Sequence, residues 1–301
     1  MTYPATGPVT LDVNLADSPI TKALKDGAVS SDLVHLNYVG PKTANQGFKP
    51  MVREGKFDGG ELAIVTYLQA REYGKPLVLL PATMVGRFQH YLLVYNSEKR
   101  PPLGPKDLEG KRVGIRSYTQ TSGMWIRGHL KNDYGVDLSK VTWVCWDDPH
   151  PAEYKDPAFV ERVPPGSKSL DQMLLDGDID AAIPGYDILK NPAMKPVFPD
   201  VTNAGPAFYE KYKAISINHL FIVRQELVDA RPDVVREIYR LLAESKAAAK
   251  LDKKIDDLPF GYEALRPSLE LAIQYSLEQG LITKRFTVDE LFDNVTRKLG
   301  A

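Results

Sequence analysis

Two histidines occupy segments in which a proton-exchanging side chain stands out. His90 lies in RFQHY, three residues after Arg87, and His219 interrupts the apolar run INHLFIV. An imidazole can exchange a proton near neutral pH, and a guanidinium can bind a carboxylate through two parallel hydrogen bonds. A single histidine in an apolar run is more often a hydrogen-bonded core residue. Both interpretations therefore stay open at this point.

A loop rich in small hydroxyl side chains forms a second candidate site. It has the sequence SYTQTSG, residues 117–123, and connects a predicted strand to the start of a predicted helix. Backbone N–H groups and the positive end of the helix dipole favour an anion at such a place. Arg127 lies one turn into the helix and adds a cation. The alternative is an ordinary helix cap without a ligand.

Carboxylates near either end of the chain are more ambiguous. Glu263 and Arg266 are three residues apart and share a face if their segment is helical, which is equally typical of a solvated ion pair. Glu61 follows two glycines, Gly59 and Gly60. These residues become informative only together with the rest of the chain.

Composition excludes several classes of protein. The 301 residues are 43% hydrophobic and 26% charged with a formal net charge of −1, so the chain is globular and has no field that attracts nucleic acid or an anionic membrane. Its single cysteine, Cys145, can form no internal disulfide. Asp147, Asp148, His150 and Glu153 are interrupted by two prolines, which argues against a metal site. The start of the chain has no apolar run of signal-peptide length, which predicts a cytoplasmic protein. A chain from which a signal peptide had been removed would look the same.

Hydrophobic patterns predict an α/β protein with mostly parallel sheets. Alternation in residues 9–15 and short apolar runs such as 77–81 and 112–115 are typical of strands, and they alternate with helical segments. Ser169 with Gln172, and Thr287 with Glu290, have the spacing of capping boxes. An apolar stripe after Pro232 predicts a helix packed on the core.

This order of elements resembles the type 2 periplasmic-binding-protein fold, in which two α/β lobes are joined by two crossover strands and a ligand lies in the cleft between them. The resemblance implies a first lobe of residues 1–95 and 216–301 and a second lobe of residues 96–215. The crossovers would be HYLLVYN and ISINHLFIV, which would bring His90 and His219 to the cleft.

An ordered set of motifs is also similar to the 4,5-dihydroxyphthalate decarboxylases. The set covers about residues 9–295 and matches the family at FDGGE, RFQHY, QTSGMWIRG, INHLFIV and PFGYEALRP. The resemblance implies a decarboxylase of a hydroxylated, phthalate-like aromatic acid from aromatic catabolism that needs no cofactor or metal. The residues it assigns are His219, His90 and Glu263 for catalysis and Arg87, Arg127, Gln120, Thr121, Ser122, Gly123, Arg266 and Glu61 for substrate binding.

In the expected reaction, His219 or His90 protonates the ring carbon that bears the carboxylate, while arginines hold the acid. The segment ADSPITK, residues 16–22, departs from the family pattern and leaves the exact substrate open. The alternative function is a non-catalytic solute-binding protein of an ABC importer, because fold does not determine function. The expected partner is a small aromatic carboxylate in either case, and a homo-oligomer stays open.

Overall fold

The computed structural model describes residues 3–300. Contacts divide the chain into two units. The first holds the chain up to Arg87, residues 215–273 and the residues from Ile282 onward, and the second holds residues 88–214 and 274–281. Residues 88–95 and 274–281 were predicted to belong to the first lobe, whereas their contacts lie in the second unit.

The first unit contains a five-stranded mixed sheet in the order β2-β1-β3-β11-β4. Its strands are β1 (Val9–Asn14), β2 (Val34–Tyr38), β3 (Gly59–Ala63), β4 (Leu77–Gly86) and β11 (Ile217–Arg224). β1 runs parallel to β2 and β3, whereas β11 is antiparallel to β3 and β4. The predicted alternation is confirmed in β1, where Val9, Leu11 and Val13 are buried. β11 is the second crossover segment predicted from sequence.

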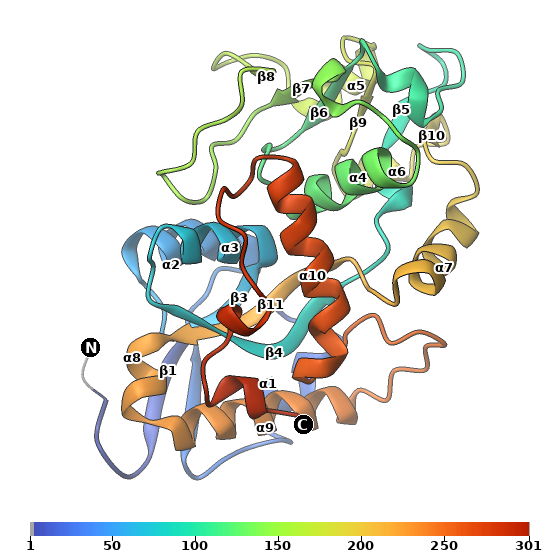
Figure 1. The fold of residues 1–301 in the computed structure, drawn as a ribbon. Helices are drawn as coiled ribbons and strands as arrows, with labels where there is room; N and C mark the ends of the chain where they lie inside the picture. Colours follow the sequence, from blue (N-terminus) through green and yellow to red (C-terminus); the bar gives the residue numbers. More distant parts are fainter. Residues whose placement is uncertain (1–2, 301) are drawn as a thin grey trace. The chain divides into compact units, whose positions relative to one another are not determined.

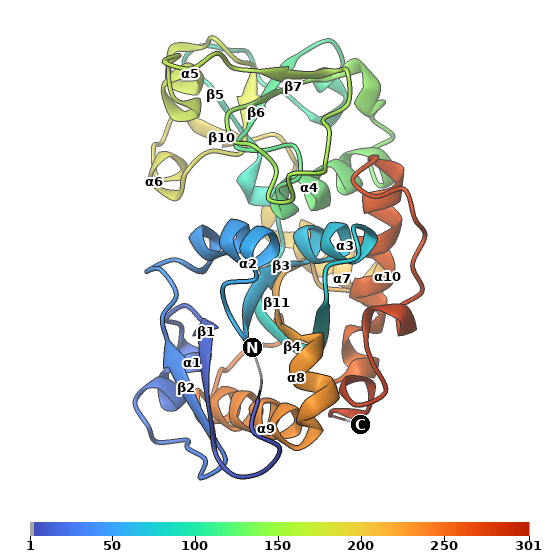
Figure 2. The same ribbon diagram turned by 90° about the vertical axis from the view of Figure 1, so that its left-hand side faces the viewer.

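Helices cover both faces of this sheet (Figures 1 and 2). They are α1 (Pro19–Lys25), α2 (Phe48–Glu54), α3 (Ile64–Glu72), α8 (Gln225–Ala230), α9 (Pro232–Ala248) and the first part of α10 (Tyr262–Glu278), with short 3₁₀ turns at Ala44–Gly47, Asp289–Leu291 and Thr296–Lys298. α2 and α3 lie on the opposite side of the sheet from α8 and α9 (Figure 2). This two-sided cover explains why the β4 run is apolar without alternation.

The stripe predicted after Pro232 forms the core of the first unit. Its apolar side chains on α9, among them Val235, Ile238 and Leu242, are at most 1% exposed and join the cluster that also holds β1, β2 and β4. α9 is tied to α1 by Ser245, whose Oγ accepts from the Leu24 N–H at 3.1 Å and donates to the Ile20 carbonyl at 2.7 Å. The prediction of a core-facing helix is confirmed.

The second unit contains a six-stranded sheet in the order β10-β5-β9-β6-β7-β8. Its strands are β5 (Val94–Asn96), β6 (Arg112–Ile115), β7 (Thr142–Cys145), β8 (Val160–Arg162), β9 (Ala181–Ala182) and β10 (Met194–Pro196). β9, β6, β7 and β8 are parallel, and β5 is antiparallel to both of its neighbours. Each unit therefore has a mostly parallel sheet with one antiparallel strand, β11 or β5, drawn from a predicted crossover.

The helices of the second unit are α4 (Thr121–Asn132), α5 (Leu170–Asp176), α6 (Tyr186–Leu189), α7 (Val201–Tyr212) and the end of α10, with 3₁₀ turns at His90–Leu92, Pro105–Leu108 and Leu138–Lys140. The Ser169 cap is confirmed, since its side chain accepts from the Gln172 N–H at 3.2 Å. α4 packs closely on the end of α10: a Cβ on Gly128 would lie 2.0 Å from the Tyr275 ring.

Two segments show the limits of local pattern. The apolar run after Gly60 forms the short β3 followed by α3, and periodicity gives no signal there because every residue from Ile64 to Ala70 is buried. Thr287 and Glu290 do form a capping box, with Glu290 accepting from the Thr287 N–H at 2.7 Å, but it opens only a 3₁₀ turn rather than a helix. Among the helices of residues 3–300, none is both long and apolar enough to cross a membrane.

Candidate functional site

His219 forms a hydrogen-bonded pair with Glu61 in the first unit. The two residues lie on adjacent antiparallel strands, where His219 is opposite Ala63 and Glu61 is opposite Phe221, so they are diagonal neighbours on one face. His219 Nδ1 lies 2.9 Å from Glu61 Oε2. The His219 side chain is 20% exposed and that of Glu61 only 3%. The imidazole thus lies between a buried carboxylate and accessible surface.

The Glu61 carboxylate is fixed at both oxygens. Oε1 accepts from the Ala16 backbone N–H at 2.8 Å, while Oε2 faces His219. An ionised carboxylate only accepts hydrogen bonds, so Nδ1 of His219 is the donor and Nε2 is the nitrogen left to exchange a proton. This geometry is the one that holds a catalytic histidine in a single tautomer and orientation.

Local sequence explains how β3 brings Glu61 to this position. Gly60 has φ +139°, and a Cβ there would lie 2.3 Å from the Asn14 carbonyl oxygen. A glycine is therefore required for β3 to approach the end of β1 this closely. Asn14 is fully buried and its side-chain amide donates to the Ala44 carbonyl at 2.9 Å, which fixes the turn leading into α2. The Phe48 ring from α2 then packs edge-on against His219 at 5.0 Å between centroids.

Arg87 follows β4 directly and is partly buried. Its backbone N–H donates to the Ser216 carbonyl at 3.3 Å, and Val85, two residues earlier, is opposite His219 in the β4–β11 pairing. The predicted arginine and the predicted histidine are thus close in the register of two adjacent strands of the first unit.

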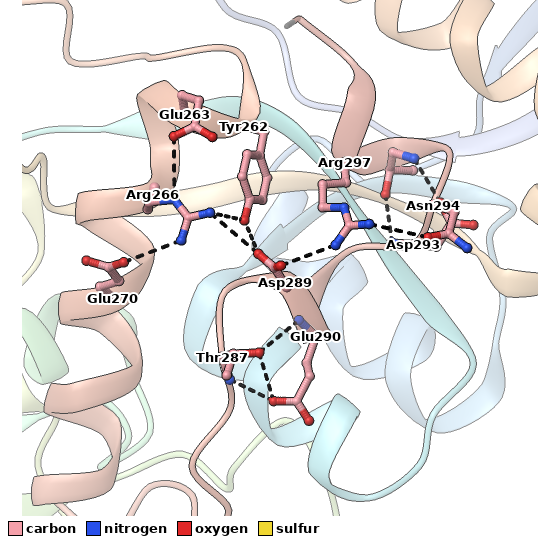
Figure 3. Close-up of polar contacts among 11 residues, drawn as sticks. Tyr262, Glu263, Arg266, Glu270, Thr287, Asp289, Glu290, Asp293, Asn294 and Arg297 are labelled. Carbon is pink, nitrogen blue, oxygen red and sulfur yellow. Dashed lines mark hydrogen bonds and ion pairs between the residues drawn. The ribbon is translucent and has the colours of Figure 1, made fainter.

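Glu263 and Arg266 lie in a different polar cluster at the start of α10 (Figure 3). Glu263 is 79% exposed and Arg266 Nε lies 3.5 Å from its carboxylate. Arg266 also contacts the Tyr262 hydroxyl and Asp289, which ties α10 to the 3₁₀ turn near the C-terminus. This is the solvated ion pair that the sequence left as the alternative. The carboxylate that orients His219 is Glu61, not Glu263.

In the second unit, Ser117–Gln120 forms the connection from β6 to α4, and Thr121, Ser122 and Gly123 form the first turn of α4, three residues earlier than predicted. Ser117 and Thr119 hydroxyls bond each other at 3.1 Å. Gly123 faces inward, since a Cβ there would lie 2.1 Å from Ile115 of β6. The glycine therefore permits the helix to pack on the strand, while the turn keeps the helix N-terminus predicted as an anion site.

Arg127 is sealed inside the second unit with 0% exposure. Its Nε donates to Gln279 Oε1 at 2.7 Å, its Nη2 donates to the Tyr118 carbonyl at 2.6 Å, and its guanidinium stacks 4.0 Å from the Tyr118 ring centroid. The family resemblance implied that Arg127 binds the carboxylate directly. A fully buried side chain has no surface to offer a ligand, so Arg127 instead positions the loop before α4 and places positive charge beneath it.

His90 is also buried, at 4% exposure, and stacks on His129 with ring centroids 4.2 Å apart. Phe198 and Phe208 close the pair edge-on. Burial and the neighbouring His129 lower the pKa of His90 from 6.5 to about 3. A histidine that stays neutral at pH 7 is a poor proton donor, which counts against the predicted role of His90.

Several residues that complete these arrangements carry no motif in the sequence. Ala16 acts through its backbone, and Asn14 and Gln279 act through a buried side chain of no recognisable motif, so no signal marked them. His129 is one α-helical turn before Asp133, at 3.6 Å between Nδ1 and Oδ2, a spacing that could have been noticed. Among residues 3–300, no group of three or more histidine, cysteine or acidic side chains is placed to hold a metal ion.

The two sheets, each with its antiparallel crossover strand, define a periplasmic-binding-protein fold. A solved structure confirms it: the alkanesulfonate-binding protein SsuA from Xanthomonas axonopodis pv. citri, bound to MOPS, superimposes with a TM-score of 0.61 at 12% identity, over 96% of this chain and 99% of its own. That likeness concerns the fold alone.

Sequence comparison identifies the nearer relationship. The chain is 28% identical over 260 residues to a 4,5-dihydroxyphthalate decarboxylase from Comamonas testosteroni, covering 79% of this chain and 76% of the relative. It is 27% identical over 175 residues to a protein of the same name from Pseudomonas putida, covering 54% of this chain and 65% of the relative. No protein-family model matches the chain. The chain is thus a homologue of proteins with this name, and the resemblance predicted from its motifs is confirmed.

Proposed function

We propose that this protein is a cofactor-independent decarboxylase of a hydroxylated aromatic carboxylic acid, with His219 as the proton donor. The observation that carries the proposal is the 2.9 Å contact between His219 Nδ1 and the buried Glu61 carboxylate. A protein that only binds a solute needs cations and N–H groups for its ligand, but it has no need of an imidazole aligned by a carboxylate. The two decarboxylase homologues support the same reaction class.

The proposed step exchanges a carbon–carbon bond for a carbon–hydrogen bond. The proton on His219 Nε2 is transferred to the ring carbon that bears the carboxylate, and a ring hydroxyl supplies the electron density for that bond. The bond to the carboxylate then breaks, its electron pair restores the aromatic ring, and carbon dioxide leaves. His219 regains its proton from water, so the cycle is balanced without an oxidant or reductant.

Glu61 acts through His219 and is therefore a positioning residue. It holds Nδ1 as the donor, which leaves Nε2 directed away from the carboxylate. A correctly placed general acid contributes about 10²- to 10⁴-fold to rate. Removing Glu61, which costs only the orientation of His219, should therefore lower the rate less than removing the His219 imidazole itself.

Binding of the acid is proposed to involve Arg87, which lies close to His219 along β4 and β11. Gln120, Thr121, Ser122 and Gly123 lie at the start of α4 in the second unit, and their role in carboxylate binding stays a prediction from the sequence. Arg127 supports that turn from below. Glu263 and Arg266 have no part in this proposal, since they pair with each other at an exposed helix start.

The test is turnover of a panel of acids by the pure protein. 4,5-Dihydroxyphthalate, other hydroxylated phthalates and hydroxybenzoates are incubated at pH 7, and carbon dioxide release is measured. We expect His219→Asn to lower kcat by at least about 100-fold and Glu61→Gln to lower it by about 10- to 100-fold, with KM little changed.

His35→Asn is the matched control, because His35 is an exposed histidine on the edge strand β2 of the same unit and should leave kcat unchanged. Undiminished turnover in His219→Asn would remove His219 from the role. Binding of the acids without turnover across the panel would instead favour the solute-binding alternative.

A further inference from the structure

The second unit contains a pocket that the proposed chemistry does not use. Its volume is about 470 Å³, within the range of about 300–1,000 Å³ typical of small-molecule sites. Its walls come from four separate segments: the loop before α4, the turn after α4, the loop before β8 and the end of α10. The apolar lining residues are Tyr118, Val136, Leu138, Pro157 and Phe159.

Two aromatic rings form one corner of this pocket. Tyr118 and Phe159 meet edge to face with centroids 5.7 Å apart. Tyr118 is only 1% exposed and holds Phe159 in place from behind, because its hydroxyl donates to the Gln279 carbonyl at 3.2 Å and the Arg127 guanidinium stacks on its ring. Phe159, in contrast, is 36% exposed, which is unusual for so apolar a ring. A flat ring lying in the pocket would cover it and add an aromatic contact.

The polar groups of the pocket select against a charged ligand. Lys131 Nζ lies 3.5 Å from Glu278 Oε2, and Asp137 adds a second carboxylate. Hydrogen bonds from neighbouring groups lower the pKa of both Glu278 and Asp137, so both are ionised at neutral pH. Lys140 Nζ lies 3.7 Å from Asp137 Oδ2, so both lysines at this pocket are already paired with carboxylates and neither is left to hold an aromatic carboxylate. A hydroxyl group fits better, since it can accept from the Lys131 ammonium and donate to the Glu278 carboxylate.

We propose that this pocket is a binding site for a small uncharged hydroxylated aromatic molecule of the phenol class. The ring lies against Phe159, which Tyr118 supports from behind, and the hydroxyl lies at the Lys131–Glu278 pair. The site is distinct from the acid-binding residues of the proposed decarboxylase, and it does not depend on that function.

The probe is phenol, which is uncharged at pH 7, with benzoate as its anionic counterpart of similar size. Binding is measured by ligand-observed NMR and by ¹H–¹⁵N chemical-shift mapping of the full chain. For a ligand this small we expect a Kd of roughly 1–10 mM for phenol and at least about fivefold weaker binding of benzoate here. The largest shifts should fall on residues 136–139 and 278–280.

Variants separate this site from others. Phe159→Ala should weaken phenol binding about threefold or more, and Lys131→Met should weaken it while raising the relative affinity for an aromatic without a hydroxyl, such as toluene. Both residues are exposed, so both variants should fold. Tyr186→Ala is the matched control, because Tyr186 is a 54% exposed aromatic of the same unit outside the pocket.

His219→Asn should leave phenol binding at this pocket unchanged, whether or not the decarboxylase proposal holds. The inference is overturned if phenol causes no shifts at these residues up to about 20 mM, several times the expected Kd. It is equally overturned if Phe159→Ala binds as the parent does, or if benzoate binds there as tightly as phenol.

Discussion

The stacked His90–His129 pair should make the second unit sensitive to mild acid. In the unfolded chain His90 takes up a proton near its ordinary pKa of 6.5, whereas burial lowers its pKa in the folded protein to about 3. Between these values only the unfolded state binds the proton. The contribution of the neutral His90 to the free energy of unfolding is therefore fully present above about pH 6.5 and is lost as the pH falls toward 3.

The size of this loss follows from the difference in bound protons. One proton bound only by the unfolded chain costs about 1.4 kcal/mol per pH unit, so lowering the pH from 6.5 to 5 should cost about 2 kcal/mol from His90 alone. Burial also lowers the pKa of His129, which acts in the same direction. The other groups that face the pair titrate outside this pH range. The pKa of the Asp133 carboxyl is lowered, and the pKa values of the Lys211 ammonium and the Tyr212 hydroxyl are raised.

The assay can be restricted to the second unit, because all three tryptophans, Trp125, Trp143 and Trp146, lie in it. Denaturant unfolding followed by tryptophan fluorescence at pH 7, 6 and 5 should give a falling free energy for the parent and a flatter profile for His90→Phe. Phenylalanine suits the site, since the imidazole packs among Phe198 and Phe208 and its Nδ1 is buried without a hydrogen bond.

His35→Asn, on the exposed edge strand of the first unit, should keep the parent profile and serves as the control. A parent free energy that is constant from pH 7 to 5 would refute the reasoning. So would an equally steep decline in His90→Phe.

Two further predictions concern residues that position the candidate site. Gly60→Ala should lower the free energy of unfolding of the first unit by about 2–5 kcal/mol, measured by far-ultraviolet circular dichroism, because the added Cβ would clash with β1 and Gly60 has φ +139°. The control is Gly74→Ala, which has φ +68° but open space around it and should cost only about 1 kcal/mol. Equal losses in the two variants would count against the close approach of Gly60 to β1. Arg127→Lys should destabilise the second unit by about 1.5–3 kcal/mol in the tryptophan assay, because a lysine has neither the planar fork that reaches Gln279 and Tyr118 nor the flat group that stacks on the Tyr118 ring. An unchanged midpoint would contradict the supporting role assigned to Arg127.

Much of the fold follows from local pattern. The alternation in β1, the apolar stripe of α9 and the cap at Ser169 are each set by neighbours within a few residues, so the sequence predicted them. The exact ends of helices and strands were harder to predict from the sequence. α4 begins at Thr121 rather than Met124, and the buried run after Gly60 divides into β3 and α3, because full burial removes the periodicity that would distinguish a strand from a helix.

For the candidate site, the chain by itself determined which chemical groups are present: two notable histidines, several arginines and a helix N-terminus with small hydroxyl side chains. Tertiary structure decided their surroundings. It placed His219 beside Glu61 through the antiparallel pairing of β11 with β3, and it buried His90 and Arg127. The reason is physical: a side chain's ability to donate a proton or bind an anion depends on its exposure and its partners, and both are set by segments more than a hundred residues apart.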